Sequence, residues 1–326
     1  MAEFLLAEGF LGGKTVEIDE DRFNEILYAK NVIKPIWEVE DTFALLANAF
    51  IEFEEYLISV GIRYFYQRDM QRDADHFFDD VRQNLNLKLI SVLTASRMYE
   101  EQLHRRMSSL SKLVGEEIDL RSSFRAVFDG SLEYRVMYAL RNHALHNQLP
   151  LGAISIGDYK LSSTGNLRDD APTRLRITVD PKISVEDFCN SDKINARIRD
   201  EVNALGFRHL DLKFFARGFL MCLARCHQDF REATESVLED ALDELHSADH
   251  HLQITKGELP KYTTLICRKG EQVEGHDIDY SKNSRIVEIR KYWSGLRWIQ
   301  RGYISSEVKA SKNTYPRAHE EIWIAD

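Results

Sequence analysis

Two long runs of apolar residues with helical spacing constrain the fold of this chain most. In residues 37–68, apolar side chains recur at alternating steps of three and four, the spacing of one face of an α-helix. Residues 73–114 carry a second such run, and Gly115 follows it as a helix-ending residue. The first stripe includes Phe43, Leu46, Phe50, Phe53, Leu57, Val60 and Tyr64, and the second Phe78, Val81, Leu85, Leu89, Val92, Tyr99, Leu103, Met107 and Leu110. Two helices of this kind are expected to pack antiparallel.

The remaining patterns predict more helices and a few strands. Residues 153–161 and 173–179 have strand character and are separated by a polar loop, which predicts a β-hairpin. Helices are expected to resume near Ser184, with buried faces over 212–230 and 237–245. The predicted fold class is therefore mainly α, an antiparallel helical bundle with a β-hairpin insert.

We divide the chain into three parts on composition. Residues 1–35 are an acidic N-terminal arm, and 36–255 are the helical domain with its hairpin insert at about 152–181. Residues 256–326 alternate in short apolar runs broken by glycines, including 262–267 and 285–290, and are expected to form a small β-rich C-terminal module.

A polar motif occupies the helix expected over residues 132–148. The run reads Arg141-Asn142-His143-Ala144-Leu145-His146, on a segment without Gly or Pro. Asn142 and His146 are i,i+4 neighbours and can share a ligand. Five residues of regular helix rotate Arg141 by roughly 140° from His146, so the long Arg side chain must bend round for the two to converge.

The Arg-Asn-x-x-x-His spacing resembles the catalytic motif of HEPN ribonucleases. Two long helices followed by a shorter motif-bearing helix also match the HEPN order, so the resemblance covers roughly residues 37–150. It implies an endoribonuclease in which Arg141 and His146 are catalytic and Asn142 supports them. In that family two motif copies meet across a dimer, which implies a homodimer with the active site at its interface. The resemblance also makes a toxin or phage-defence effector, with an antitoxin or defence-system partner, a reasonable expectation.

The chemistry of these side chains agrees with RNA cleavage. A neutral imidazole can accept the proton of the RNA 2′-hydroxyl, which then attacks the adjacent phosphate. The Arg guanidinium would stabilise the growing phosphate charge. This reaction needs neither a metal nor a cofactor, and DNA, which lacks the 2′-hydroxyl, would be inert.

Charge is distributed unevenly, and this bears on RNA binding. The net charge is −10, but residues 1–60 alone hold thirteen acidic and four basic residues. Residues 285–317 hold eight basic residues against two acidic ones, interleaved with aromatics, a composition suited to phosphate contact and base stacking. An exposed sheet with aromatic core positions is an equally open reading of this segment. The predicted RNA-binding residues are Arg135, Lys291, Trp293, Arg297, Trp298 and Arg301.

Other sequence features bear on location and cofactors. No stretch approaches 18 uninterrupted apolar residues, and the N-terminus lacks the basic start of a secretory signal, so we expect a cytoplasmic protein without a membrane segment. The four cysteines form no Cys-x-x-Cys pair, which argues against a zinc knuckle.

Several alternatives stay open. Arg97 and His104 meet a looser form of the motif without the Asn. His246 and His250 have the i,i+4 spacing of a metal pair, but the Glu of the zinc-protease pattern is missing. The main functional alternative is a non-catalytic HEPN-like module that binds RNA, a nucleotide or a protein. A helical scaffold with an accidental motif is the third.

Overall fold

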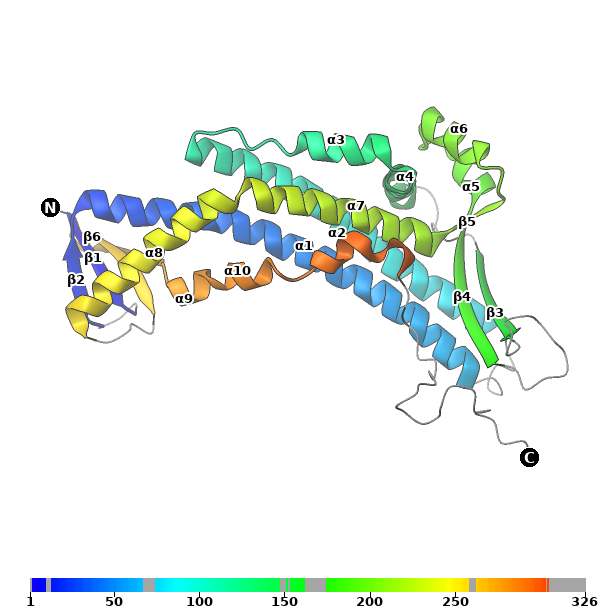
Figure 1. Cartoon of the computed structure of the whole chain (residues 1–326), viewed down its shortest axis with the longest axis horizontal. Helices are drawn as coiled ribbons and strands as arrows, with labels where there is room; N and C mark the ends of the chain where they lie inside the picture. The colour runs from blue at the N-terminus through cyan, green and yellow to red at the C-terminus, as the bar shows by residue number, and fades with distance from the viewer. Residues whose placement is uncertain are drawn as a thin grey trace, which may run out of the picture.

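The computed structural model describes residues 2–9, 13–66, 74–146, 151, 153–161, 174–257, 262–302 and 304. The molecule is mainly helical and elongated, as Figure 1 shows. Helices α1 (Glu20–Tyr66) and α2 (Ala74–Val114) lie side by side and antiparallel along most of its length. The predictions of a mainly helical fold and of two long packed helices are confirmed.

Helix α1 runs through residue 35, where composition placed the boundary between the N-terminal arm and the helical domain. Asp19 begins the helix by accepting a hydrogen bond from the Arg22 backbone N–H at 2.7 Å. The apolar stripe continues upstream through buried Phe23, Ile26 and Ile33. Pro35 lies inside the helix, where it removes one backbone donor but does not interrupt the packed face.

Two more long helices complete the bundle. Helices α7 (Leu212–Ala233) and α8 (Glu235–Lys256) follow each other along α1, where the sequence predicted buried helical faces. Between α2 and α7 lie the short helices α3 (Arg121–Gly130) and α4 (Leu132–His146). Figure 1 shows α4 nearly end-on, so it crosses the direction of its long neighbours. It packs against both α2 and α7.

A four-stranded antiparallel sheet joins the N-terminal strands to a hairpin from the C-terminal part of the chain. Its order is β2 (Thr15–Ile18), β1 (Ala2–Glu8), β6 (Thr263–Lys269) and β7 (Gln272–Asp277). The register places Leu6 opposite Leu265. The expected N-terminal arm and the expected C-terminal module therefore share one sheet, at the end of the bundle where α1 starts.

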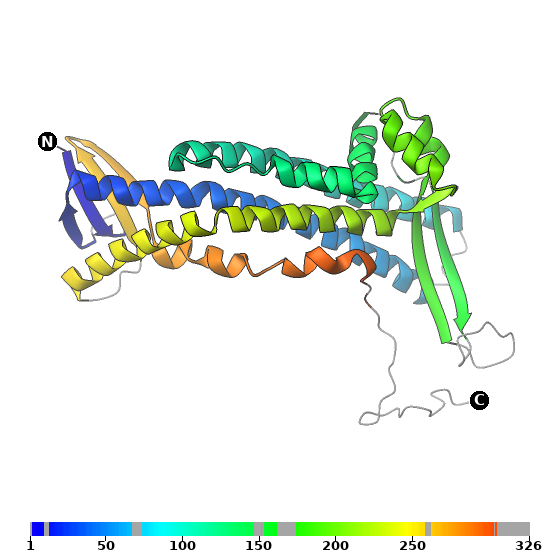
Figure 2. The same cartoon turned by 45° about the horizontal axis from the view of Figure 1, so that its top comes forward.

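A three-stranded sheet lies at the opposite end of the bundle (Figure 2). The predicted hairpin is confirmed as β3 (Ala153–Leu161) and β4 (Arg174–Ser184), which pair antiparallel. The short strand β5 (His209–Asp211) extends this sheet. The chain between β4 and β5 forms helices α5 (Val185–Asn190) and α6 (Ala196–Ala204).

The described part of the chain after β7 is helical, which corrects the strand expected over 285–290. It forms α9 (Tyr280–Asn283), α10 (Arg285–Ile289) and the 3-10 helix η2 (Ser294–Arg301), which lies along α7. Asp279 begins α9 by accepting from the Lys282 N–H at 3.2 Å. The apolar side chains of this segment dock on the helical bundle rather than on a sheet, because β7 ends at Asp277.

Candidate functional site

The motif helix α4 is anchored firmly at its first turn. Ser131 precedes it, and its hydroxyl accepts a hydrogen bond from the Tyr134 N–H at 3.1 Å. Glu133 accepts from the side-chain amide of Gln300 on η2 at 2.7 Å. Gly218 of α7 meets Glu133 closely, since an added Cβ there would lie 2.8 Å from it. The start of α4 is therefore tied to both α7 and η2.

Arg141 points toward α2 and is nearly buried, with 6% of its surface exposed. Its Nη1 donates to the Glu100 carboxylate at 3.1 Å. Its guanidinium carbon lies 4.3 Å from the ring centroid of Tyr138, a cation–π contact one turn back on α4. Its buried Nε has no hydrogen-bond partner among the described residues. Within that part of the chain, α2 holds Arg141 through the ion pair with Glu100.

The other two motif residues are described only in part. Asn142 is half-buried, next to Arg141. His146 is the last residue of α4, so its backbone is helical as the sequence predicted, but its side chain lies outside the described part of the structure. Whether Arg141 and His146 converge therefore stays a prediction.

The looser pair, Arg97 and His104, lies on α2 beside Glu100. Arg97 Nε forms an ion pair with Glu101 at 2.8 Å. His104 is half-buried, with its ring centroid 5.1 Å from that of Phe124, and burial lowers its pKa. The contacts of Arg97 and His104 lead to different neighbours and do not join the two side chains.

Arg135, one of the predicted RNA-binding residues, is buried and engaged within the protein. Its Nη1 donates to the backbone carbonyls of Phe128 and Asp129 at 2.6 Å and 2.8 Å, and its Nε bonds to Glu201 at 2.8 Å. Arg135 therefore closes the end of α3 onto α4 and α6.

The basic and aromatic residues of the C-terminal segment are mostly engaged within the protein. Trp293 is partly buried against the core, and Lys291 forms an ion pair with Glu288, one turn before it, at 2.6 Å. Arg297 Nε donates to a backbone carbonyl of its own helix at 3.2 Å. Trp298 is 74% exposed, whereas the Arg301 side chain lies outside the described residues. Of the predicted RNA-binding aromatics, only Trp298 presents most of its surface to solvent.

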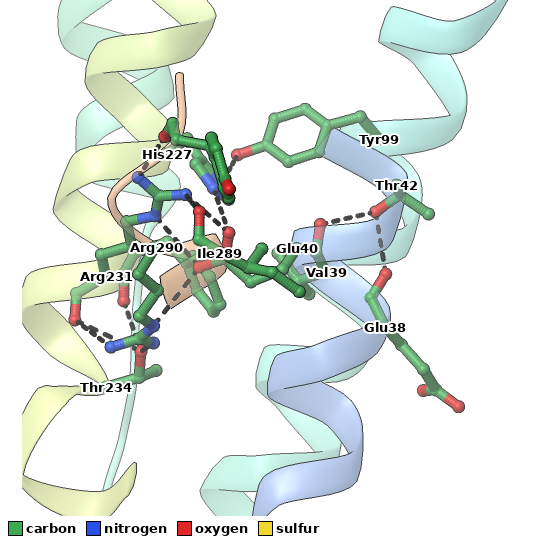
Figure 3. A network of polar contacts seen from close by, with 12 residues as sticks. Glu38, Val39, Glu40, Thr42, Tyr99, His227, Arg231, Thr234, Ile289 and Arg290 are labelled. Carbon is green, nitrogen blue, oxygen red and sulfur yellow. Dashed lines mark hydrogen bonds and ion pairs between the residues drawn. The ribbon is translucent and has the colours of Figure 1, made fainter. Parts of the chain in front are cut away.

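A buried cluster of charged and polar side chains is centred on Glu40 of α1, and no pattern in the sequence predicted it (Figure 3). Glu40 is 1% exposed and accepts from Arg231 through both oxygens, at 3.0 Å and 2.7 Å. His227 Nε2 lies 3.0 Å from the same carboxylate, and its Nδ1 is 3.1 Å from the Tyr99 hydroxyl. Arg290 of the C-terminal segment forms a further ion pair with Glu40 at 3.3 Å.

The charge states of this cluster follow from burial and pairing. Burial raises the pKa of Glu40, but the bonds from His227 and Arg231 outweigh it and lower the value to about 2. Burial lowers the pKa of His227 to about 4, against the opposing pull of Glu40. His227 is therefore neutral at pH 7, with its Nε2–H donating to Glu40 and its Nδ1 accepting from Tyr99. Because Glu40, His227 and Tyr99 are nearly inaccessible to solvent, we assign the cluster a structural role.

Among the residues that the structure describes, no group of three or more His, Cys, Asp or Glu side chains is placed to hold a metal ion. His246 instead lies against Tyr280, with ring centroids 4.8 Å apart. No described helix is both long and apolar enough to cross a membrane.

Comparisons with protein-family profiles, with curated proteins and with solved structures found no significant match to this chain.

Proposed function

We propose that this protein is a HEPN-like, metal-independent endoribonuclease that cleaves single-stranded RNA at the C-terminal end of α4. The observation that carries the proposal is the presence of Arg141, Asn142 and His146 within one short helix that is anchored at its start and packed across α2 and α7. An anchored helix can hold reacting groups in fixed positions, which general acid–base catalysis requires.

In this proposal each side chain has a distinct role. His146 accepts the proton of the RNA 2′-hydroxyl, and the resulting oxygen attacks the neighbouring phosphorus to form a 2′,3′-cyclic phosphate. The bond from phosphorus to the 5′-oxygen breaks, and a second proton donor protonates that oxygen as it leaves. Arg141 stabilises the additional negative charge on the phosphate, and Asn142 orients the phosphate or the imidazole through its amide. Glu100 positions Arg141 from α2. A role in a toxin–antitoxin pair or in phage defence would fit such an activity.

The test compares wild-type protein with His146→Ala and Arg141→Ala on labelled single-stranded RNA in EDTA. We expect cleavage by wild type that leaves cyclic-phosphate ends, and a loss of about 10²-fold or more in each variant. Exposed residues of the same types supply matched controls, Arg82→Ala on α2 and His209→Ala on β5, which should cleave normally. An RNA with a single 2′-deoxy nucleotide at the cut site should resist. Equal cleavage by His146→Ala and wild type would contradict the proposal.

One observation favours a second candidate, a non-catalytic HEPN-like module that binds RNA, a nucleotide or a protein. Arg141 is 6% exposed and already paired with Glu100, so it offers little surface to a substrate in this conformation. The same experiment separates the two candidates, since a binding module would retain RNA in a filter assay without cutting it.

A further inference from the structure

The end of α1 carries a row of large apolar side chains that are open to solvent. Ile58 is 40% exposed, Ile62 54%, Phe65 41% and Tyr66 78%. Steps of four, three and one residue place them along one side of the helix. The rings of Phe65 and Tyr66 are in contact, with centroids 4.7 Å apart. We call these four residues the α1 end patch. A contiguous exposed apolar patch marks a surface that another segment or another protein covers.

The apolar surface continues from α1 onto β4. Gly61 lies between Ile58 and Ile62, and a Cβ added there would lie 3.7 Å from Val179 Cγ2 and 4.0 Å from Ile177 Cγ2. These two β4 side chains therefore approach the α1 backbone beside the patch, and Ile177 is only half-buried. Figure 1 shows the end of α1 and β4 at the same end of the bundle. An occupant of the α1 end patch can therefore contact both elements.

The described C-terminal segment leads to this patch. Arg217 of α7 donates to both carboxylate oxygens of Glu54 on α1, through Nε and Nη2, each at 2.7 Å. Its third nitrogen, Nη1, donates to the backbone carbonyl of Gly302 at 2.7 Å. Glu54 lies one turn before Ile58 on the same side of α1. A single guanidinium therefore joins the chain at Gly302 to the border of the patch, and Ile304, which is 83% exposed, follows two residues later.

Residues 305–326 come next in the sequence and lie outside the described part of the structure. They hold three consecutive apolar residues, Ile322, Trp323 and Ile324, which we call the Ile-Trp-Ile segment. The stretches 67–73, 147–150 and 162–173 also lie outside the described part and adjoin elements near this end of the bundle. Each of these stretches holds only one large apolar residue. The Ile-Trp-Ile segment therefore offers the best apolar match to the patch.

The chain after Ile304 is long enough to reach the patch. Eighteen residues lead from Ile304 to Ile322. An extended chain of that length spans at most ~60 Å. The distance along α1 from Glu54 to Phe65 is about 17 Å, since a helix rises about 1.5 Å per residue. Attachment at Gly302 keeps the Ile-Trp-Ile segment near α1, which raises its effective concentration at the patch above that of a separate molecule.

We propose that the Ile-Trp-Ile segment docks on the α1 end patch of the same chain. Trp323 lies against Ile62 and Phe65, and the isoleucines on either side of it extend the contact along α1. The Trp323 ring contributes a large apolar area, and removal of both surfaces from water drives the contact. The docked segment closes an apolar face that would otherwise be open to other proteins. This surface is separate from the proposed nuclease site, so its test does not depend on RNA cleavage.

Acrylamide quenching of Trp323 fluorescence tests this contact in the whole chain. The emission of Trp323 is obtained as the difference between a chain and its Trp323→Phe variant. In wild type this emission should be shielded from the quencher. Ile62→Asp should raise its quenching constant several-fold, because the substitution places a charge under the indole. Leu45→Asp is the matched control, since Leu45 is also 54% exposed on α1 but lies outside the patch, and it should leave the quenching unchanged. Circular dichroism checks that both variants fold.

Three outcomes of the quenching experiment would overturn the proposal. Free quenching of Trp323 in wild type would show that the Ile-Trp-Ile segment does not dock. Shielding that persists in Ile62→Asp would place the segment on another surface. Shielding that develops only as protein concentration rises would mean that a second copy of the chain supplies the occupant.

Thiol labelling measures coverage of the patch from the side of α1. Ile58→Cys should react with N-ethylmaleimide several-fold more slowly than it does in a chain that also carries Trp323→Ser. Leu45→Cys should react at the same rate with and without Trp323→Ser. The four native cysteines are buried, so they add little background. Equal labelling rates for Ile58→Cys in the two chains would show that the Ile-Trp-Ile segment does not cover the patch and would overturn the proposal.

Discussion

Two Arg–Glu pairs in this protein are built in opposite ways. Glu40 is 1% exposed and is surrounded by Arg231, Arg290 and His227. The Glu100 side chain is 22% exposed and, among the described residues, it pairs with Arg141 at 3.1 Å. A buried charge is tolerated when its hydrogen bonds are satisfied, as those of Glu40 are. Within the described part of the chain, the pair on the motif helix has fewer partners than the Glu40 cluster, and its carboxylate is the more exposed of the two.

The largest effect is expected at Glu40. Glu40→Gln keeps the shape of the side chain but leaves the buried Arg231 without its carboxylate and takes one of two carboxylates from Arg290, which still pairs with Glu235. The free energy of unfolding should therefore fall by about 3–5 kcal/mol. Urea denaturation measures this loss. Glu38→Gln is the matched control, because the Glu38 side chain is 33% exposed in its ion pair with Arg106 and should cost about 1 kcal/mol or less. Similar losses in the two variants would contradict the structural role of the cluster.

A pH effect of intermediate size is expected at His227. Its folded pKa of about 4 lies below its ordinary value of 6.5, so the unfolded chain binds a proton more readily in this range. The contribution of His227 to the free energy of unfolding is therefore complete above pH 6.5. It is lost, by roughly 3 kcal/mol, as pH drops toward 4. Glu40, with its pKa lowered from 4.5 to about 2, adds a further loss below pH 4.5.

His227→Gln isolates this contribution. Urea midpoints measured between pH 4 and pH 7 should fall less steeply with acidity in the variant than in wild type, although the variant is less stable at pH 7. His209→Gln, at an exposed His of β5, should retain the wild-type slope. An unchanged slope in His227→Gln would mean that the buried imidazole does not set the acid sensitivity.

The smallest stability effect is expected at the motif helix. Glu100→Gln removes one charged bond from a partly exposed carboxylate, so unfolding free energy should fall by only about 1 kcal/mol. Glu101→Gln, next to it on the exposed face of α2, should cost less still. If Glu100→Gln instead destabilised the protein as much as Glu40→Gln, Arg141 would be a structural residue and the contrast between the two pairs would disappear.

The long helices were predictable because their signal is local. The helix predicted from the alternation of three and four in residues 37–68 continues upstream through Pro35, where composition placed the end of the N-terminal arm. Gly115 adopts a positive φ of 78° immediately after α2, as its glycine suggested. The hairpin of β3 and β4 was also visible, since both strands lie close together in the sequence.

The C-terminal segment shows where local signals mislead. The run around residues 285–290 alternates like a strand, but it forms α10, and Arg290 reaches the buried Glu40 about 250 residues earlier in the chain. Likewise Arg135 lies on the polar face of its predicted helix, yet α6 and the end of α3 cover it. The partners of Arg290 and Arg135 lie in distant segments, so the sequence around each of these side chains does not reveal them.

The sequence by itself determined the helical character of the chain, its two longest helices, the hairpin and the position of Arg141, Asn142 and His146 within one helix, because periodicity and spacing act over a few residues. Only the tertiary structure decided that the first strands pair with β6, that Glu40 meets His227 and Arg231, and that Arg141 is held by Glu100. Those contacts join distant segments, and their geometry depends on how whole helices pack rather than on any local pattern.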